Sequence, residues 1–180
     1  DSAVGGISTY PPGAKENGGI FLHTNPWVMI AETILGRGDN AFQYYNQINP
    51  ASKNGILDVF ESEPYCYPQN ILGDEHKQFG MGRNAWLSGT STWTYQAATQ
   101  FILGIRASFN GLVVDPCIPS AWAGFEATRK FRGATYQITV KNPDHVCKGV
   151  ANMVVDGQEI DSNVAPIFTK GVHKVEVTLG

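Results

Sequence analysis

The sequence has few cysteines, no basic cluster and no long hydrophobic run. Its three cysteines, Cys66, Cys117 and Cys147, form no C-x-x-C pair, which favours reduced thiols in a cytoplasmic protein over a disulfide framework or a zinc site. The net charge of −3, without a Lys/Arg cluster, argues against a nucleic acid or an anionic membrane as partner. No apolar run approaches the length of a membrane span, and no signal segment opens the chain. The sequence therefore predicts a cytoplasmic protein that binds neither membrane nor nucleic acid and holds no metal.

The composition is that of a folded protein. With 42% hydrophobic and 16% charged residues over 180 positions, the chain can bury one good core or two small ones. It opens at Asp1 without a methionine and reaches its motifs within a few residues, so we expect it to be cut from a longer protein.

The segment WLSGTSTW, residues 86–93, predicts the start of a helix. Apolar residues recur at helical spacing over residues 94–103, and Ser88 or a neighbouring hydroxyl residue can cap the first turn. Gly89 lets a ligand approach the backbone, where unpaired amide N–H groups favour an anion. The alternative is a cap that binds nothing, because Ser and Thr cap many helices.

A loop near the start carries candidate ligand-binding side chains. Residues 8–19 are rich in proline and glycine and cannot form regular structure. Tyr10, Lys15 and Glu16 on this loop are residue types that bind sugar hydroxyls or a phosphate. A solvated surface loop is the alternative interpretation.

A second helix start follows in the segment IFLHTNPW, residues 20–27, with Thr24 or Asn25 as cap and Pro26 as the first helical residue. His23 lies just before it. A histidine in this position is either a structural hydrogen-bonding residue or, because another helix start carries Ser88, part of a shared anion site.

Periodicity divides the rest of the chain into a helical first part and a β-rich second part. Apolar spacing predicts a helical hairpin over residues 27–48, and residues 49–83 form a long irregular excursion typical of a lid or site wall. After residue 111, short alternating segments predict antiparallel strands. We place a domain boundary near residues 106–110 and interpret Asp115 as a turn or solvent-face residue.

Several strings, in the same order over nearly the whole chain, resemble the C-terminal part of the family 94 glycoside phosphorylases, which include cellobiose, cellodextrin, laminaribiose and chitobiose phosphorylases. The strings are PPGAKENGGIFLHTNPW (residues 11–27), AETILGRG (31–38), EPYCYPQ (63–69), WLSGT (86–90), and ILGIR followed by GLVVDPCIP (102–106 and 111–119). The resemblance implies an α+β multidomain fragment. Residues 1–107 would be the last helices of an (α/α)6 catalytic barrel, and residues 108–180 an antiparallel two-layered jelly-roll β-sandwich.

The resemblance also implies a reaction: reversible, inverting phosphorolysis of a β-linked glucose disaccharide or oligosaccharide of the cellobiose type, giving α-glucose 1-phosphate and a free sugar. Phosphate replaces the water of an inverting glycosidase and is already anionic. The site therefore needs one carboxylic acid to protonate the leaving oxygen and no catalytic base. Inorganic phosphate is then a co-substrate and no cofactor is expected. The expected partners are the remaining part of the same enzyme and, as is usual in the family, a second copy in a homodimer.

Site residues carry over from the family's motifs. The phosphate ligands of the Phe-x-His-Thr and Trp-Leu-(Thr/Ser)-Gly-Thr strings match His23, Ser88 and Gly89. Ser88 stands where many members have Thr, which keeps the hydroxyl and loses a methyl group. The family's sugar-binding residues match Tyr10, Lys15, Glu16 and Gln69.

Two departures leave the resemblance incomplete. Gly6 falls where cellobiose-specific members carry an acidic residue against the acceptor's reducing end, so the acceptor stays open. The family's general acid, an Asp, and an Arg phosphate ligand lie upstream of this chain. None of the residues Asp39, Asp58, Asp74 and Asp115 matches that acid.

Two other classes of function stay open. The chain could be a β-sandwich carbohydrate-binding module with a helical preface, in which exposed aromatics such as Trp122 and Phe125 bind sugar without phosphate. It could also be a structural C-terminal part of a related glucan-processing protein that has lost phosphorolysis.

Overall fold

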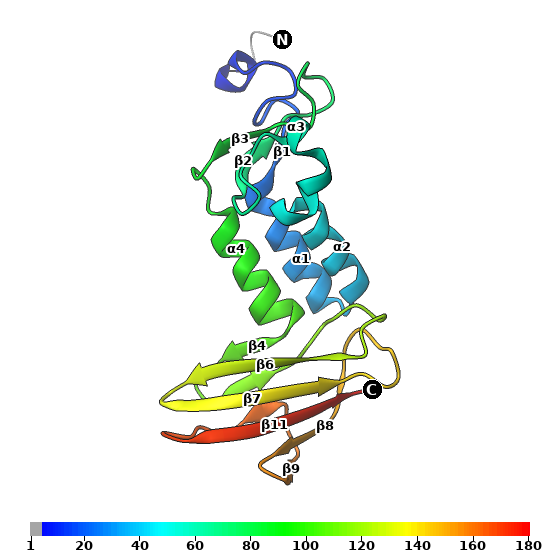
Figure 1. The fold of residues 1–180 in the computed structure, drawn as a ribbon, viewed down its shortest axis with the longest axis vertical. Coiled ribbons are helices and arrows are strands. Elements are labelled where there is room, and N and C mark those ends of the chain that lie inside the picture. The colour runs from blue at the N-terminus through cyan, green and yellow to red at the C-terminus, as the bar shows by residue number, and fades with distance from the viewer. Residues whose placement is uncertain (1–4) are drawn as a thin grey trace. The chain divides into compact units, whose positions relative to one another are not determined.

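The computed structural model describes residues 5–180, which form two compact units. Unit 1 comprises the residues up to Met29 together with residues 43–95, and unit 2 comprises residues 30–42 and 96–180. The helices and the short strands of the first part, and the long strands of the second, make the chain α+β (Figure 1). The (α/α)6 barrel, the jelly roll and the domain division at residues 107 and 108 stay predictions.

The helical elements follow the sequence pattern. The predicted hairpin is confirmed as α1 (Asn25–Ile34) and α2 (Gly38–Ile48), and Pro26 lies in the first turn of α1. A short 3₁₀ turn, η2 (Leu22–Thr24), precedes α1 and contains His23. The predicted helix after residue 90 is α4 (Thr90–Gln96), which continues as a π-helical turn over Ala97–Ile102. Among the residues described, none of the helices is both long and apolar enough to cross a bilayer.

The excursion over residues 49–83 is more ordered than its sequence indicates. It contains a 3₁₀ segment η3 (Pro50–Ile56), a one-turn helix α3 (Leu57–Phe60), and two strands, β2 (Pro68–Ile71) and the start of β3 (Gly82–Ala85). A further 3₁₀ segment, η1 (Gly5–Thr9), opens the described chain.

The strands β1 (Ile20–Phe21), β2 and β3 form an antiparallel sheet in unit 1 with β2 at its centre. Asn70 on β2 lies opposite Phe21 on one side and Arg83 on the other. Strands of two to four residues with polar side chains show no detectable two-residue period, so the sequence did not predict this sheet.

Unit 2 contains two sheets. The smaller one has the order β10-β5-β4 and is antiparallel, and the larger has the order β6-β7-β11-β8-β9. The strands are β4 (Ile105–Ala107), β5 (Leu112–Val114), β6 (Gly124–Phe131), β7 (Ala134–Lys141), β8 (Val150–Val155), β9 (Gln158–Ile160), β10 (Val164–Ala165) and β11 (Val172–Leu179). Between β8 and β9, Asp156 and Gly157 both have positive φ, as a tight two-residue hairpin turn requires.

The expectation that every strand pair is antiparallel is wrong at one place. β11 pairs with β7 in parallel, with Val172 opposite Thr135 and Thr178 opposite Lys141, while it pairs with β8 antiparallel. The reason is topological. β7 and β8 run in opposite directions, so a strand inserted between them must be parallel to one of the two.

The larger sheet buries one face. Along β7, buried residues alternate with more exposed ones, and β8 and β11 show similar alternation over most of their lengths. The fully or nearly fully buried side chains of these strands are Tyr136, Ile138, Val140, Met153, Val175, Val177 and Leu179. Each buried aliphatic side chain contributes roughly 1.5–3 kcal/mol to folding.

Asp115 is not the solvent-face residue that the sequence suggested. Its carboxylate accepts hydrogen bonds from the Arg106 guanidinium at 3.2 Å and the Lys148 ammonium at 3.0 Å, and its side chain is mostly buried. All three residues belong to unit 2. The carboxylate therefore holds β4 and the segment before β8 to the chain after β5.

Candidate functional site

The imidazole of His23 packs directly against the backbone of Gly89. A Cβ atom built on Gly89 would lie 2.7 Å from Cε1 and 3.2 Å from Nδ1 of His23, closer than the surfaces of these atoms allow. Both residues belong to unit 1. The structure thus brings together two of the three predicted phosphate ligands, which are far apart in the sequence, and explains why a residue without a side chain stands at position 89.

Ser88 lies beside this contact and caps α4. Its Oγ accepts a hydrogen bond from the backbone N–H of Thr90 at 3.1 Å, and the hydroxyls of Ser88 and Thr90 share a second hydrogen bond. The carbonyl of Gly89 accepts from Trp93 N–H at 3.1 Å, which starts the helix. If the Thr90 hydroxyl donates to Ser88, the Ser88 O–H proton is free to donate to an incoming anion.

Aromatic rings fix the orientation of His23. The imidazole meets the edge of Trp27 with ring centroids 5.6 Å apart, and Trp27 meets Trp93 at 5.7 Å, both in T-shaped arrangements. Such edge contacts each contribute about 0.5–1.5 kcal/mol beyond simple burial. The two predicted helix starts are therefore tied together through side chains from α1 and α4.

The loop over residues 10–19 holds two of the predicted sugar ligands close to one another. The Lys15 ammonium lies 5.2 Å from the centroid of the Tyr10 ring, within the range of a cation–π contact. Lys15 adopts a left-handed backbone conformation with φ of 48°, and the Asn17 amide donates to the Tyr10 carbonyl at 2.8 Å. Glu16 on the same loop is exposed.

Gln69 contacts the segment that carries the phosphate candidates. Its amide Nε2 donates to the carbonyl of Leu87 at 3.2 Å, one residue before Ser88. Because neighbouring strand residues point to opposite faces, Gln69 and Asn70 on β2 lie on different sides of the small sheet. The predicted residues thus form two groups within unit 1: His23, Ser88, Gly89 and Gln69 around the start of α4, and Tyr10 with Lys15 on the loop.

A pocket of about 230 Å³ lies next to the second group. Tyr10 and Lys15 line it from the loop, and β2, β3 and the segment between them supply residues that the sequence did not single out. These lining residues are Asn70, Leu72, His76, Gln78, Arg83 and Asn84. The sequence could not predict that Arg83 lies opposite Asn70, because the short strands of this sheet show no alternation of apolar and polar residues.

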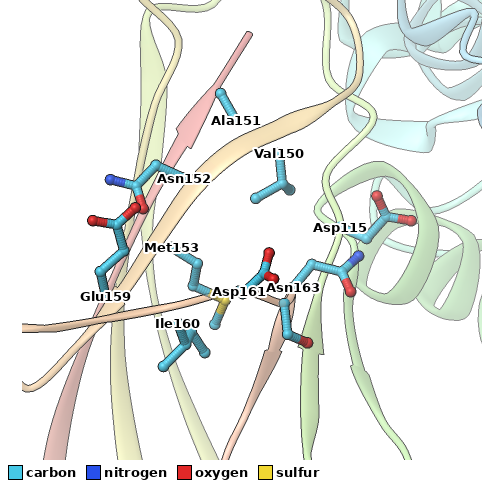
Figure 2. Close-up of a pocket in the computed structure, with 10 residues that line it drawn as sticks. Asp115, Val150, Ala151, Asn152, Met153, Glu159, Ile160, Asp161 and Asn163 are labelled. Atoms are coloured by element: carbon cyan, nitrogen blue, oxygen red, sulfur yellow. The ribbon is translucent and has the colours of Figure 1, made fainter.

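A pocket of about 670 Å³ belongs to unit 2 and contains none of the predicted site residues. Figure 2 shows Glu159 and Asn152 at one end of it and Asp115 at the other. The acidic side chains of Glu159 and Asp161 on its wall oppose the binding of an anion such as phosphate. Within residues 5–180, no group of three or more His, Cys, Asp and Glu side chains could hold a metal ion.

In unit 1, the Ser88 hydroxyl, the His23 imidazole and the Gly89 backbone lie together at the start of α4, and a small polar pocket lies on the same unit. The chain belongs to the glycosyl hydrolase 94 superfamily, because residues 1–104 match the model of that superfamily's catalytic domain.

Three curated relatives are phosphorylases. The chain is 48% identical to an N,N'-diacetylchitobiose phosphorylase of Vibrio proteolyticus over 177 residues, which cover 98% of this chain and 22% of the relative. It is 33% identical to a solabiose phosphorylase of Paenibacillus borealis, covering 99% of this chain and 23% of that protein. It is also 33% identical to a 3-O-beta-D-glucopyranosyl-beta-D-glucuronide phosphorylase of the same species, with 97% and 23% covered. The chain thus spans less than a quarter of the length of these relatives.

Proposed function

We propose that this chain supplies the phosphate-binding groups and part of the sugar-binding wall of an inverting disaccharide phosphorylase. The observation that carries the proposal is the contact between the His23 imidazole and Gly89, with the Ser88 hydroxyl at the next residue. A hydroxyl and an imidazole N–H are hydrogen-bond donors, and Gly89 lets the imidazole approach the start of α4 closely. The phosphorylase relatives support the same assignment.

In the proposed reaction, phosphate attacks the anomeric carbon of a β-linked disaccharide or oligosaccharide. The bond from that carbon to the leaving oxygen breaks, one carboxylic acid protonates the oxygen, and an α-sugar 1-phosphate and a free sugar result. We propose that the general acid is an Asp in the part of the enzyme upstream of this chain, and that the enzyme is a cytoplasmic homodimer. Phosphate is a co-substrate and needs no base, because it is already anionic.

The proposal has a coarse part, the type of reaction, and a fine part, the identity of the sugar in the substrate. The coarse part is phosphorolysis of a β-linked disaccharide. For the fine part, the sequence alone suggested a cellobiose-type substrate, but the relative with 48% identity acts on N,N'-diacetylchitobiose. We therefore take both a glucose and an N-acetylglucosamine disaccharide into the test.

The experiment is steady-state phosphorolysis by the intact enzyme at varied phosphate, with Ser88→Ala and His23→Ala variants. Losing one hydrogen bond to a charged group costs roughly 1.5–3 kcal/mol, so we expect phosphorolysis to fall about tenfold to a hundredfold. A higher Michaelis constant for phosphate with unchanged kcat indicates that the hydrogen bond is equally strong in the bound state and in the transition state. A lower kcat indicates that the bond strengthens as phosphate attacks. Unchanged phosphate kinetics in both variants would reduce the site to an ordinary helix cap.

The same assay separates the other two classes of function. A carbohydrate-binding module binds the disaccharide equally with and without phosphate and releases no sugar phosphate. A structural part that has lost phosphorolysis binds neither ligand.

A further inference from the structure

Asn70 is a buried amide without a hydrogen-bond partner. Its side chain is only 1% exposed, and neither Oδ1 nor Nδ2 has a partner among residues 5–180. A buried polar group left unpaired destabilises the fold, and most such groups in folded proteins have a hydrogen-bond partner. Asn70 lines the 230 Å³ pocket, so a molecule that enters this pocket can supply the missing partner.

The pocket lining is rich in hydrogen-bond donors. None of its lining residues is acidic, whereas Lys15 and Arg83 carry fixed positive charges. His76 accepts a hydrogen bond at Nδ1 from the backbone N–H of Gln78 at 3.1 Å. The neutral ring of His76 therefore carries its hydrogen on Nε2 and offers another donor.

The pocket walls come from separate parts of unit 1. Asn70 and Arg83 are direct cross-strand neighbours on β2 and β3, so their side chains share one face of the sheet. The loop that carries Tyr10 and Lys15 forms the facing wall. This loop is tied to the end of β2, because Gly73 N–H donates to the Gly13 carbonyl at 2.7 Å.

Size limits the occupant. The volume of about 230 Å³ lies below the roughly 300–1,000 Å³ of pockets for drug-sized ligands. It admits one sugar ring, not a chain of rings. Tyr10 provides an aromatic side and Leu72 an aliphatic one, and the donors lie around them.

We propose that this pocket, through Asn70, Arg83 and Lys15, selects a sugar ring whose substituent carries a carbonyl-type oxygen, an acetamido or a carboxylate group, over an unsubstituted hexose. The proposal rests on the proposed function and names the sugar class of that site. The Asn70 amide donates to the carbonyl-type oxygen, and an acetamido N–H can donate back to Oδ1. Arg83 and Lys15 add charge-assisted bonds where the substituent is a carboxylate.

The test uses the intact enzyme and two readouts. The first is sugar binding by calorimetry in the absence of phosphate, with glucose, N-acetylglucosamine and glucuronate as probes. The second is phosphate release from α-glucose 1-phosphate, and from its N-acetylglucosamine counterpart, with the same three sugars as acceptors. Tenfold or stronger binding of at least one substituted sugar over glucose is the expected result. Equal binding of glucose and both substituted sugars overturns the inference.

Variants identify the residues responsible. Asn70→Asp keeps the shape but removes both N–H donors, and we expect it to abolish the preference for the substituted sugar. Arg83 is exposed, so Arg83→Gln tests the same pocket without disturbing buried packing. It should weaken glucuronate binding about tenfold if the carboxylate is the substituent recognised, or leave N-acetylglucosamine preferred if the acetamido group is. A preference that survives both Asn70→Asp and Arg83→Gln overturns the assignment of these residues.

A matched control is Lys77→Gln, which removes an exposed cation from the same segment but does not line the pocket. The two readouts also separate the two proposals. Selective sugar binding without any phosphate release would uphold this pocket and reject phosphorolysis, and phosphate release with no selectivity would do the reverse.

Discussion

The five-stranded sheet of unit 2 and the three-stranded sheet of unit 1 differ in what they bury. The five-stranded sheet of unit 2 has strands of up to eight residues, and β7, β8 and β11 turn one mainly apolar face inward. The three-stranded sheet of unit 1 has strands of two to four residues and fully buries Asn70, whose two amide atoms are both unpaired among the described residues. The unpaired polar atoms of the five-stranded sheet, Arg129 Nε and Asn152 Oδ1, belong to partly exposed residues. A surface built for stability alone would place an apolar side chain at position 70. This difference favours the proposal that ligand binding belongs to unit 1, while the large sheet of unit 2 contributes stability.

The largest expected effect is on Gly89 in unit 1. Gly89→Ala places a Cβ 2.7 Å from His23 Cε1, so the imidazole must move, and a displacement of about 1 Å can cost about a hundredfold in rate. We expect kcat/KM for phosphorolysis by the intact enzyme to fall by about that factor. Gly55→Ala is the matched control, because nothing lies within 4 Å of a Cβ at Gly55. Equal activity of the two variants would reject the packing of His23 on Gly89.

The next effect tests unit 2 and should leave chemistry alone. The buried Tyr136 hydroxyl donates to the Pro166 carbonyl at 2.8 Å and accepts from Phe168 N–H at 3.1 Å. Tyr136→Phe leaves both backbone groups unpaired, at a cost of about 1–3 kcal/mol. Faster hydrogen exchange at Phe168, with phosphorolysis per folded molecule unchanged, is the expected outcome. The control is Tyr65→Phe, which changes an exposed side chain. A loss of activity per folded molecule in Tyr136→Phe would contradict the view that unit 2 contributes stability and not ligand binding.

A smaller effect sharpens the role assigned to the start of α4. Thr90→Val keeps the shape of this buried residue but removes the hydroxyl that shares a hydrogen bond with Ser88. Without that partner the Ser88 O–H is no longer oriented toward the anion, and the loss of roughly 0.5–1.5 kcal/mol should raise the Michaelis constant for phosphate about threefold to tenfold. A lower constant would mean that Thr90 competes with phosphate for Ser88.

The smallest effect concerns pH and unit 2. The Asp156 carboxylate hydrogen-bonds His173 at 2.7 Å, which raises the pKa of His173 and lowers the pKa of Asp156. A raised histidine pKa stabilises the fold below the unfolded pKa of about 6.5, and this contribution is lost as pH rises through the folded value. A lowered aspartate pKa contributes above about 3.9 and is lost as pH falls. The pair therefore stabilises most between those two pH values.

The variant for this prediction is His173→Gln, which cannot titrate. Thermal unfolding of wild type and variant should differ most near pH 6, and the difference should shrink toward pH 9. The rings of His173 and Phe168 stack with centroids 3.5 Å apart. If the difference in melting temperature stays constant with pH, this stacking, and not the charge of His173, is what stabilises the fold.

Much of the fold could be predicted because the long helices and strands carry clear periodic patterns of apolar residues. The helical hairpin follows from apolar spacing and Pro26, and the long strands follow from alternation, since each pattern has one way to bury its apolar side. The parallel β7–β11 pair could not be predicted, because each strand's own pattern is the same whichever way its neighbour runs. The buried ion pairs of Asp115 were missed for a similar reason: Arg106 and Lys148 lie 9 and 33 residues away.

The candidate site was predicted in part. His23 and Gly89 were named from motifs, and the structure places them in contact. The structure places Gln69 beside Leu87. The binding roles of all the site residues named from the family motifs stay predictions. Asn70 was missed because an asparagine next to a named glutamine carries no signal until its burial and lack of partners are known.

The position of β11 between β7 and β8 determines when the larger sheet can form during synthesis. The hairpins β6–β7 and β8–β9 are both made before β11 and pair locally, yet neither hairpin pairs with the other in the finished sheet. Until Val172–Leu179 has emerged, each presents an unpaired strand edge to the surroundings. The nascent chain therefore carries two hairpins with unpaired edges for the time needed to make the 19 residues from Asp161 to Leu179 (179 − 160), which at about 5–20 residues per second is roughly one to four seconds.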